Sequence, residues 1–216
     1  MQAGTVFSLV QNNQPVEGCT ISGQLFPGKQ AEALLFSLAQ GTSISAESYP
    51  QGRLYLGLAG ELVLQDPEEQ RQVGAGQVAF RKGGSLTKLL APQAAIYAEI
   101  PIKEEKNMAM ALDAGKVMKL ADLVPYQAGK IVNRDLVDEA HMKFVVLSFA
   151  GGTALPEHAA PGQALIFALD GEAVITYEGK DHLIKAGENF VFAPGGLHAV
   201  RVEQGQQFKM ALLLNL

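Results

Sequence analysis

Short apolar runs separated by turn residues recur along the whole chain. The clearest stretch, from Leu165 to Gly196, reads LIFALDG, EAVITYEG, KDHLIKAG and ENFVFAPGG, and each run of β-branched and aromatic residues ends in turn-forming residues. This rhythm predicts an all-β chain of many short strands, arranged as a sandwich or a barrel. The four residues from Tyr177 to Lys180 have the composition of a tight hairpin turn.

The two halves of the chain match each other at a constant offset of 111 residues. The identities include Gly4/Gly115, Gly18/Gly129, Gly60/Gly171, Glu61/Glu172, Gly76/Gly187 and Leu86/Leu197. A repeat of this length is the size of a whole domain rather than of a solenoid unit. We therefore expect two domains, residues 1–105 and 113–216, joined through the charged stretch from Lys103 to Leu112.

The second copy contains two motifs that resemble those of the cupin superfamily. Residues from Gly152 read GTALPEHAAPGQALIFALDGEA, and residues from Gly187 read GENFVFAPGGLHAV. The first family motif is a Gly, His-x-His, a Glu and a closing Gly, and the second runs from a Gly through Pro and Gly to a final His. His158 falls on the first His of the first motif, and His198 on the His of the second. The resemblance implies two tandem cupin barrels of the double-stranded β-helix or jelly-roll type.

The second copy also departs from the family motif at two ligand positions. Ala160 stands in place of the second His, and Ala164 in place of the Glu, while Gln163 is the neighbouring polar side chain. The resemblance thus implies a divalent-metal site of His158, His198 and Gln163, with Zn, Fe, Ni and Mn not distinguished. Two imidazoles and a neutral amide offset little of the metal's charge, so we expect weak binding, and a pocket without metal is the alternative.

The first copy has no histidine at any of these positions. Shifting by 111 residues replaces His158 by Glu47, Ala160 by Tyr49, Gln163 by Gly52 and His198 by Thr87. We expect this N-terminal barrel to lack metal ligands and to serve as a scaffold. Glu47 and Tyr49 would face its cavity, where a small ligand could bind without a metal. The remaining histidines, His141 and His182, lie outside the motifs, and we interpret them as surface residues.

Composition excludes several classes of function. The 216 residues carry a net charge of −5 without any cluster of Lys or Arg, so nucleic acid is not an expected partner. The apolar runs are far shorter than the roughly 20 residues of a membrane helix. Cys19 is the only cysteine, and the first residues lack the pattern of a signal peptide. These features predict a cytoplasmic protein.

Three functions remain open at this stage. The first is a metal-dependent enzyme acting on a small polar metabolite, in which the metal polarises a substrate oxygen or activates water; the sequence identifies no catalytic acid or base for it. The second is a non-catalytic module that binds a sugar or an organic acid. The third is a structural or regulatory homodimer in which neither pocket is functional.

Overall fold

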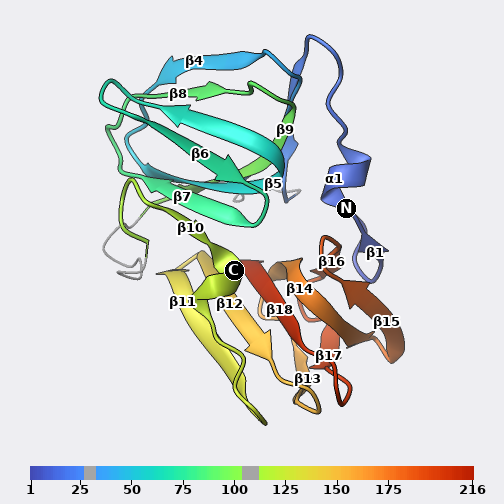
Figure 1. Cartoon of the computed structure of the whole chain (residues 1–216). Coiled ribbons are helices and arrows are strands. Elements are labelled where there is room, and N and C mark those ends of the chain that lie inside the picture. The colour runs from blue at the N-terminus through green and yellow to red at the C-terminus, as the bar shows by residue number, and fades with distance from the viewer. Residues whose placement is uncertain (27–32, 104–111) are drawn as a thin grey trace. The chain divides into compact units, whose positions relative to one another are not determined.

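The chain folds into two compact units that consist almost entirely of β-strands. The computed structural model describes residues 1–26, 33–103 and 112–216 (Figure 1). Met1–Leu9 and Leu120–Leu216 form one unit, here called the C-terminal unit, and Val10–Lys119 form the other, the N-terminal unit. No helix in these described ranges is long and apolar enough to cross a membrane. The expected junction at Lys103 to Leu112 lies largely outside the described residues.

The C-terminal unit contains a nine-stranded sheet in the order β1-β16-β14-β18-β12-β11, in which β15 also pairs with β14 and β17 with β13 and β14. A 3₁₀ helix, Leu120–Leu123, leads into it. The strands are β1 (Val6–Phe7), β11 (Ile131–Glu139), β12 (Met142–Phe149), β13 (Ala154–Ala159), β14 (Gln163–Tyr177), β15 (Lys180–Lys185), β16 (Asn189–Phe192), β17 (Leu197–Arg201) and β18 (Phe208–Asn215).

The N-terminal unit repeats this arrangement with the order β10-β7-β5-β9-β3-β2, in which β6 also pairs with β5 and β8 with β4 and β5. A short helix α1 (Leu9–Asn12) precedes these strands. They are β2 (Thr20–Gln24), β3 (Leu34–Leu38), β4 (Ser43–Glu47), β5 (Gly52–Gln65), β6 (Gln70–Gly74), β7 (Gln77–Arg81), β8 (Thr87–Leu90), β9 (Ala95–Ile102) and β10 (Val117–Lys119).

The first strand of each sequence copy joins the sheet that the other copy forms. β1 pairs with β16, with Val6 opposite Phe190, and β10 pairs with β7, with Val117 opposite Ala79. The compact units therefore differ from the expected domains 1–105 and 113–216, because residues 1–9 pack with the second copy and residues through 119 with the first. A sequence repeat shows where each copy begins, but it does not show which sheet the first strand of that copy joins.

The offset between the two copies changes once in the structure. Phe36 lies opposite Tyr97 in the N-terminal unit, and Leu147 lies opposite Met210 in the C-terminal unit. Phe36 and Leu147 keep the offset of 111 residues, whereas Tyr97 and Met210 differ by 113. The second copy thus carries two additional residues in the loop before β18, and equivalent positions beyond this loop must be shifted accordingly.

Glycines at equivalent positions explain part of the repeated sequence pattern. A Cβ atom on Gly60 would lie 1.8 Å from the carbonyl oxygen of Ala94, and one on Gly171 would lie 1.8 Å from that of Gln207. Both glycines also have positive φ angles, 65° and 68°, so any other residue would clash and be strained. The shared glycines therefore preserve a close approach between the long central strand and its neighbour.

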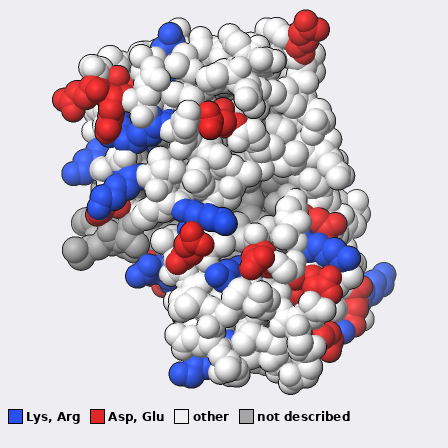
Figure 2. All heavy atoms as spheres, viewed as in Figure 1, with Lys and Arg blue, Asp and Glu red and all other residues white. Residues whose placement is uncertain are grey.

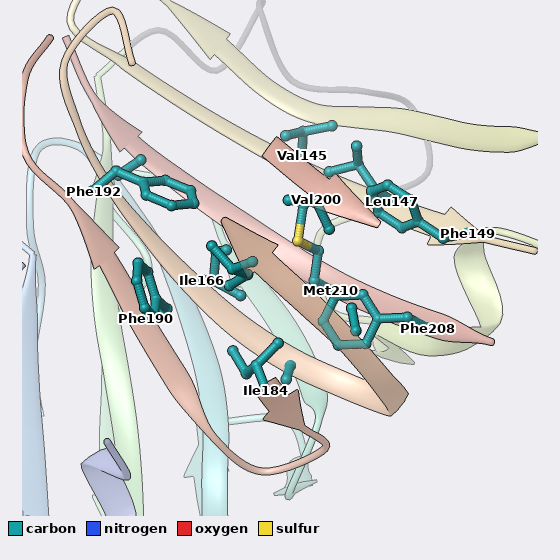
Figure 3. Packing of buried hydrophobic residues seen from close by; sticks show 14 of the residues in the cluster. Val145, Leu147, Phe149, Ile166, Ile184, Phe190, Phe192, Val200, Phe208 and Met210 are labelled. Carbon is teal, nitrogen blue, oxygen red and sulfur yellow. The ribbon is translucent and has the colours of Figure 1, made fainter. Parts of the chain in front are cut away.

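The interior of the C-terminal unit is a continuous apolar cluster (Figure 3). Every second residue along β14, Ala164, Ile166 and Ala168, belongs to it, as the two-residue period of a strand requires. The predicted hairpin turn is confirmed, since β14 ends at Tyr177 and β15 starts at Lys180. Glu178 and Gly179 between them both have positive φ angles, which is typical of a type I′ turn.

Candidate metal site

His158 and His198 lie side by side on neighbouring strands. They are direct partners in the antiparallel pairing of β13 with β17, so their side chains share one face. The centroids of their rings are 4.1 Å apart. His158 is exposed, whereas His198 is buried with 6% of its surface accessible. The pair therefore sits where the interior of the unit meets solvent.

Hydrogen bonds determine that the same ring nitrogen carries the proton in both histidines. Nδ1 of His158 lies 3.0 Å from the carbonyl oxygen of Pro156, and Nδ1 of His198 lies 3.1 Å from that of Gly196. A carbonyl oxygen can only accept, so Nδ1 must donate in each case. In the neutral imidazole the lone pair then lies on Nε2 of both rings, which leaves both Nε2 atoms able to bind a metal.

The surroundings of His198 favour its neutral form. Its ring stacks on Phe192 with a centroid distance of 3.9 Å and an interplanar angle of 22°. Burial lowers the pKa of His198 below its ordinary value, and the adjacent His158 lowers it further, against the raising effect of the hydrogen bond to Gly196. A neutral imidazole is the form that binds metal ions.

Gln163, the expected third ligand, is not brought to the histidines. Ala164 is buried in the interior cluster, so the adjacent Gln163 projects from the opposite face of β14. Ala160 and Ala164, which replace the family's second His and its Glu, are both buried in that cluster. Across the described parts of the chain, no group of three or more His, Cys, Asp or Glu side chains could hold a metal. The site thus offers two nitrogen ligands.

Tyr177 is a polar neighbour of this pair that the motifs do not include. It lies directly opposite His198 in the pairing of β14 with β17, and its ring centroid is 5.7 Å from that of Phe192. The Tyr177 hydroxyl accepts a hydrogen bond from the backbone N–H of Ala193 at 3.3 Å. Only the strand register brings this tyrosine to the histidines, and its position before the hairpin turn was the one signal available in the sequence.

The other two histidines lie away from the pair. His182 on β15 is half-buried, and its ring packs on Phe190 at a centroid distance of 5.2 Å, so it is less exposed than expected. Nε2 of His141 lies 3.3 Å from Oε2 of the buried Glu139. Acidic and basic side chains lie beside one another on the face shown in Figure 2, without a field of a single sign there.

Comparisons with known proteins agree with this fold. Residues 145–214 match the family model described as a cupin domain. No curated protein matches the sequence. Among solved structures, the "Cupin 2 conserved barrel domain protein" from Leptotrichia buccalis has a TM-score of 0.88 at 27% identity, covering 100% of this chain and 98% of that one.

Two more distant structures share the fold. The putative glyoxylate induced protein from Pseudomonas aeruginosa has a TM-score of 0.62 at 17% identity, covering 91% of this chain and 79% of its own. A variant of salicylate 1,2-dioxygenase from Pseudoaminobacter salicylatoxidans has a TM-score of 0.62 at 10% identity, with coverages of 85% and 69%. The family match supports a cupin domain within the second copy, and these more distant structures show a shared fold alone.

Proposed function

We propose that the C-terminal unit binds a divalent transition metal through Nε2 of His158 and Nε2 of His198, and that the metal holds a small polar metabolite. The observation that carries this proposal is the direct pairing of two imidazoles whose Nδ1 atoms both face carbonyl oxygens. A metal at about 2.0–2.2 Å from each nitrogen needs the nitrogens roughly 3 Å apart. The 4.1 Å between the ring centroids is compatible with that requirement.

A metal with two protein ligands keeps several positions for water or for oxygen atoms of a ligand. Such a metal polarises a bound oxygen, which is the chemistry of a metal-dependent enzyme. Tyr177 faces the same side as His198 and has a hydroxyl proton to donate to a bound metabolite. Phe192 and the buried Ala160 and Ala164 give the site apolar walls. Because no carboxylate offsets the charge of the metal, binding is weak.

The N-terminal unit is, in this proposal, a second cupin barrel without metal ligands, which makes the chain a bicupin. The support for this is the equivalent strand order of the two sheets together with the sequence repeat. Glu47 and Thr87 take the paired positions of the two histidines. A hydroxyl and a lone carboxylate make a poor site for a transition metal.

The test is metal titration of tag-free protein by calorimetry with Co²⁺, Ni²⁺ and Zn²⁺, together with metal analysis after dialysis. We expect one site per chain, and His158→Ala and His198→Ala each to weaken binding at least tenfold, since each removes one of two ligands. His182→Ala is the matched control, because His182 lies on β15 against Phe190 and should leave affinity unchanged. Equal metal affinity in the natural chain and in both variants would refute the proposal.

A further inference from the structure

The N-terminal unit is polar at positions where the C-terminal unit is mostly apolar. Glu47 of β4 lies opposite Thr87 of β8, just as His158 lies opposite His198. Further equivalent positions, read from the repeat and the strand registers, are Tyr49 and Ala160, Arg53 and Ala164, Tyr55 and Ile166, Arg81 and Phe192, Tyr97 and Met210, and Glu99 and Leu212. The first copy therefore lacks the two histidines, but it has hydrogen-bonding side chains at most of the positions where the second copy has apolar ones.

Most of these polar side chains project into the interior of the N-terminal unit, whereas Glu47 is exposed at its edge and Tyr49 is half-buried. Tyr55 of β5 and Tyr97 of β9 belong to its buried cluster. Arg53 and Glu99 stand two residues away from them along the same strands, so they project from the same faces. Tyr55 and Glu99 are also direct cross-strand partners. The polar groups thus converge on one region of the interior.

An ion pair and an aromatic contact hold this region together. Nε of Arg53 lies 3.1 Å from Oε1 of Glu99, and their side chains are only 17% and 8% exposed. The Arg53 guanidinium also lies over the ring of Tyr49, at 4.1 Å from its centroid. The Tyr49 hydroxyl donates to Oε2 of Glu47. We call Glu47, Tyr49, Arg53, Tyr97 and Glu99 the polar cluster.

The Tyr97 hydroxyl is the independent sign of a ligand. Tyr97 is fully buried, and its hydroxyl has no hydrogen-bond partner within the described residues. Its ring stacks on Phe36 at 5.0 Å, which fixes the direction of the hydroxyl. Burial raises the pKa of Tyr97, and Glu99, Tyr55, Tyr49 and Glu47 raise it further, so this hydroxyl is close to the charges of the polar cluster. Buried hydroxyl groups are rarely left without a partner.

A second set of charges beside the polar cluster is already neutralised. Arg81 lies directly opposite Arg53 in the pairing of β5 with β7. Its Nη2 is 2.8 Å from Oδ2 of Asp66, and Asp66 also accepts a hydrogen bond from Arg71 at 2.9 Å. The Arg71 hydrogen bond lowers the pKa of Asp66 below its usual range, as does a backbone hydrogen bond from Glu68. Arg71 also forms an ion pair with Glu69, so two carboxylates balance the two arginines and Arg81 adds little net positive charge for an incoming anion.

We propose that the polar cluster binds a small neutral molecule with several hydroxyl groups, of the sugar or polyol class, without a metal. The cluster contains one guanidinium, paired with Glu99, and a second carboxyl group, Glu47, bonded to Tyr49, so an anion meets two carboxyl groups and a cation meets Arg53. A hydroxyl group satisfies both kinds of neighbour, because it donates to a carboxylate and accepts from Arg53 or Tyr97. The ring of Tyr49 offers an apolar surface for the carbon atoms. This site is separate from the histidine pair and does not depend on it.

The test uses the full chain in EDTA, so that metal binding contributes nothing. Thermal shift and saturation-transfer NMR are recorded with D-glucose, D-xylose, L-arabinose, D-ribitol and myo-inositol at about 10 mM, because a ligand of the folded state raises Tm by mass action. A parallel panel contains malonate, succinate and pyruvate. We expect a saturable rise in Tm with at least one hydroxyl compound and none with the carboxylates.

Tyr97→Phe removes only the unpartnered hydroxyl and should weaken that binding at least tenfold while the chain stays folded. Tyr126→Phe is the matched control, since Tyr126 donates instead to Asp170 in the C-terminal unit and should leave affinity unchanged. His158→Ala should bind the same probe normally, which separates this site from the proposed metal site. Absence of binding by the whole hydroxyl panel, binding of carboxylates alone, or unchanged affinity in Tyr97→Phe would overturn the proposal.

Discussion

Replacing the buried ion pair Arg53–Glu99 tests whether these charges serve stability or ligand binding. The C-terminal unit supplies the comparison, because Ala164 and Leu212 occupy the equivalent positions there without any charge. We consider the single variant Glu99→Leu and the double variant Arg53→Ala/Glu99→Leu. The single variant leaves the Arg53 guanidinium buried without its carboxylate. The double variant instead introduces the apolar residue types that stand at the equivalent positions of the C-terminal unit.

The expected magnitudes follow from burial. Removing one partner of a fully buried pair costs about 3–5 kcal/mol. The Arg53 side chain is 17% exposed and keeps some hydration and its contact with the Tyr49 ring, so we expect Glu99→Leu to cost ~2–3 kcal/mol. The double variant should lie within about 1 kcal/mol of the natural chain, because replacing both charges by apolar groups removes the desolvation cost as well as the attraction.

Urea unfolding measures these differences. The chain has no tryptophan, and Tyr49, Tyr55 and Tyr97 lie in the N-terminal unit, so near-ultraviolet circular dichroism of tyrosine reports chiefly on that unit. With a slope of roughly 1–3 kcal/mol per molar urea, the single variant should unfold at about 0.7–3 M less urea. A loss below about 0.5 kcal/mol in Glu99→Leu, or a double variant as unstable as the single one, would refute this reasoning about burial.

Three further predictions test other parts of the structure. Burial raises the pKa of Glu99, although Arg53 opposes this rise. The protonated Glu99 side chain therefore stabilises the fold fully below the unfolded pKa of 4.5, and this stabilisation is lost as pH rises through the folded pKa. Glu99→Gln, which cannot ionise, should therefore gain stability relative to the natural chain as pH rises above 4.5, and a constant difference in urea midpoint would contradict this. Ala160→His with Ala164→Glu should raise Co²⁺ affinity at least tenfold by calorimetry, because it supplies the two missing ligands; unchanged affinity in a folded variant would argue against the site. Asn189 accepts from the Leu9 N–H at 2.9 Å and donates to the Ile166 carbonyl at 3.1 Å, so Asn189→Ala should cost about 2–4 kcal/mol in urea unfolding. An effect below about 1 kcal/mol would show that this link between the start of α1 and β14 matters little.

The two copies in this chain have similar strand arrangements with different interiors. One interior keeps a pair of imidazoles among apolar side chains, and the other lacks histidine but gathers carboxyl, guanidinium and phenol groups. A buried ion pair by itself adds little net stability to a fold. The presence of the Arg53–Glu99 pair in the N-terminal unit, with apolar residues at the equivalent positions of the C-terminal unit, therefore favours a role in binding. The expectation that the first copy is merely a scaffold therefore does not account for the polar cluster.

The sequence alone determined the all-β class, the duplication and the cupin resemblance, because these depend on local patterns. Strand periodicity, turn residues such as Gly179, and glycines needed at close approaches such as Gly171 are written in short segments of the chain. The motif spacing also identified His158 and His198, since each motif lies in one contiguous stretch.

Tertiary structure decided the properties that depend on strand register and on the two faces of each strand. Register placed His158 directly opposite His198 and brought Tyr177 to them, while the alternation of faces along β14 turned Gln163 away. Pairing across distant segments put β1 into the sheet of the second copy. It also joined Arg53 to Glu99, which lie far apart in the sequence and belong to no motif. A side chain's neighbours in a sheet come from other strands, and for that reason the sequence pattern of one strand could not reveal the polar cluster.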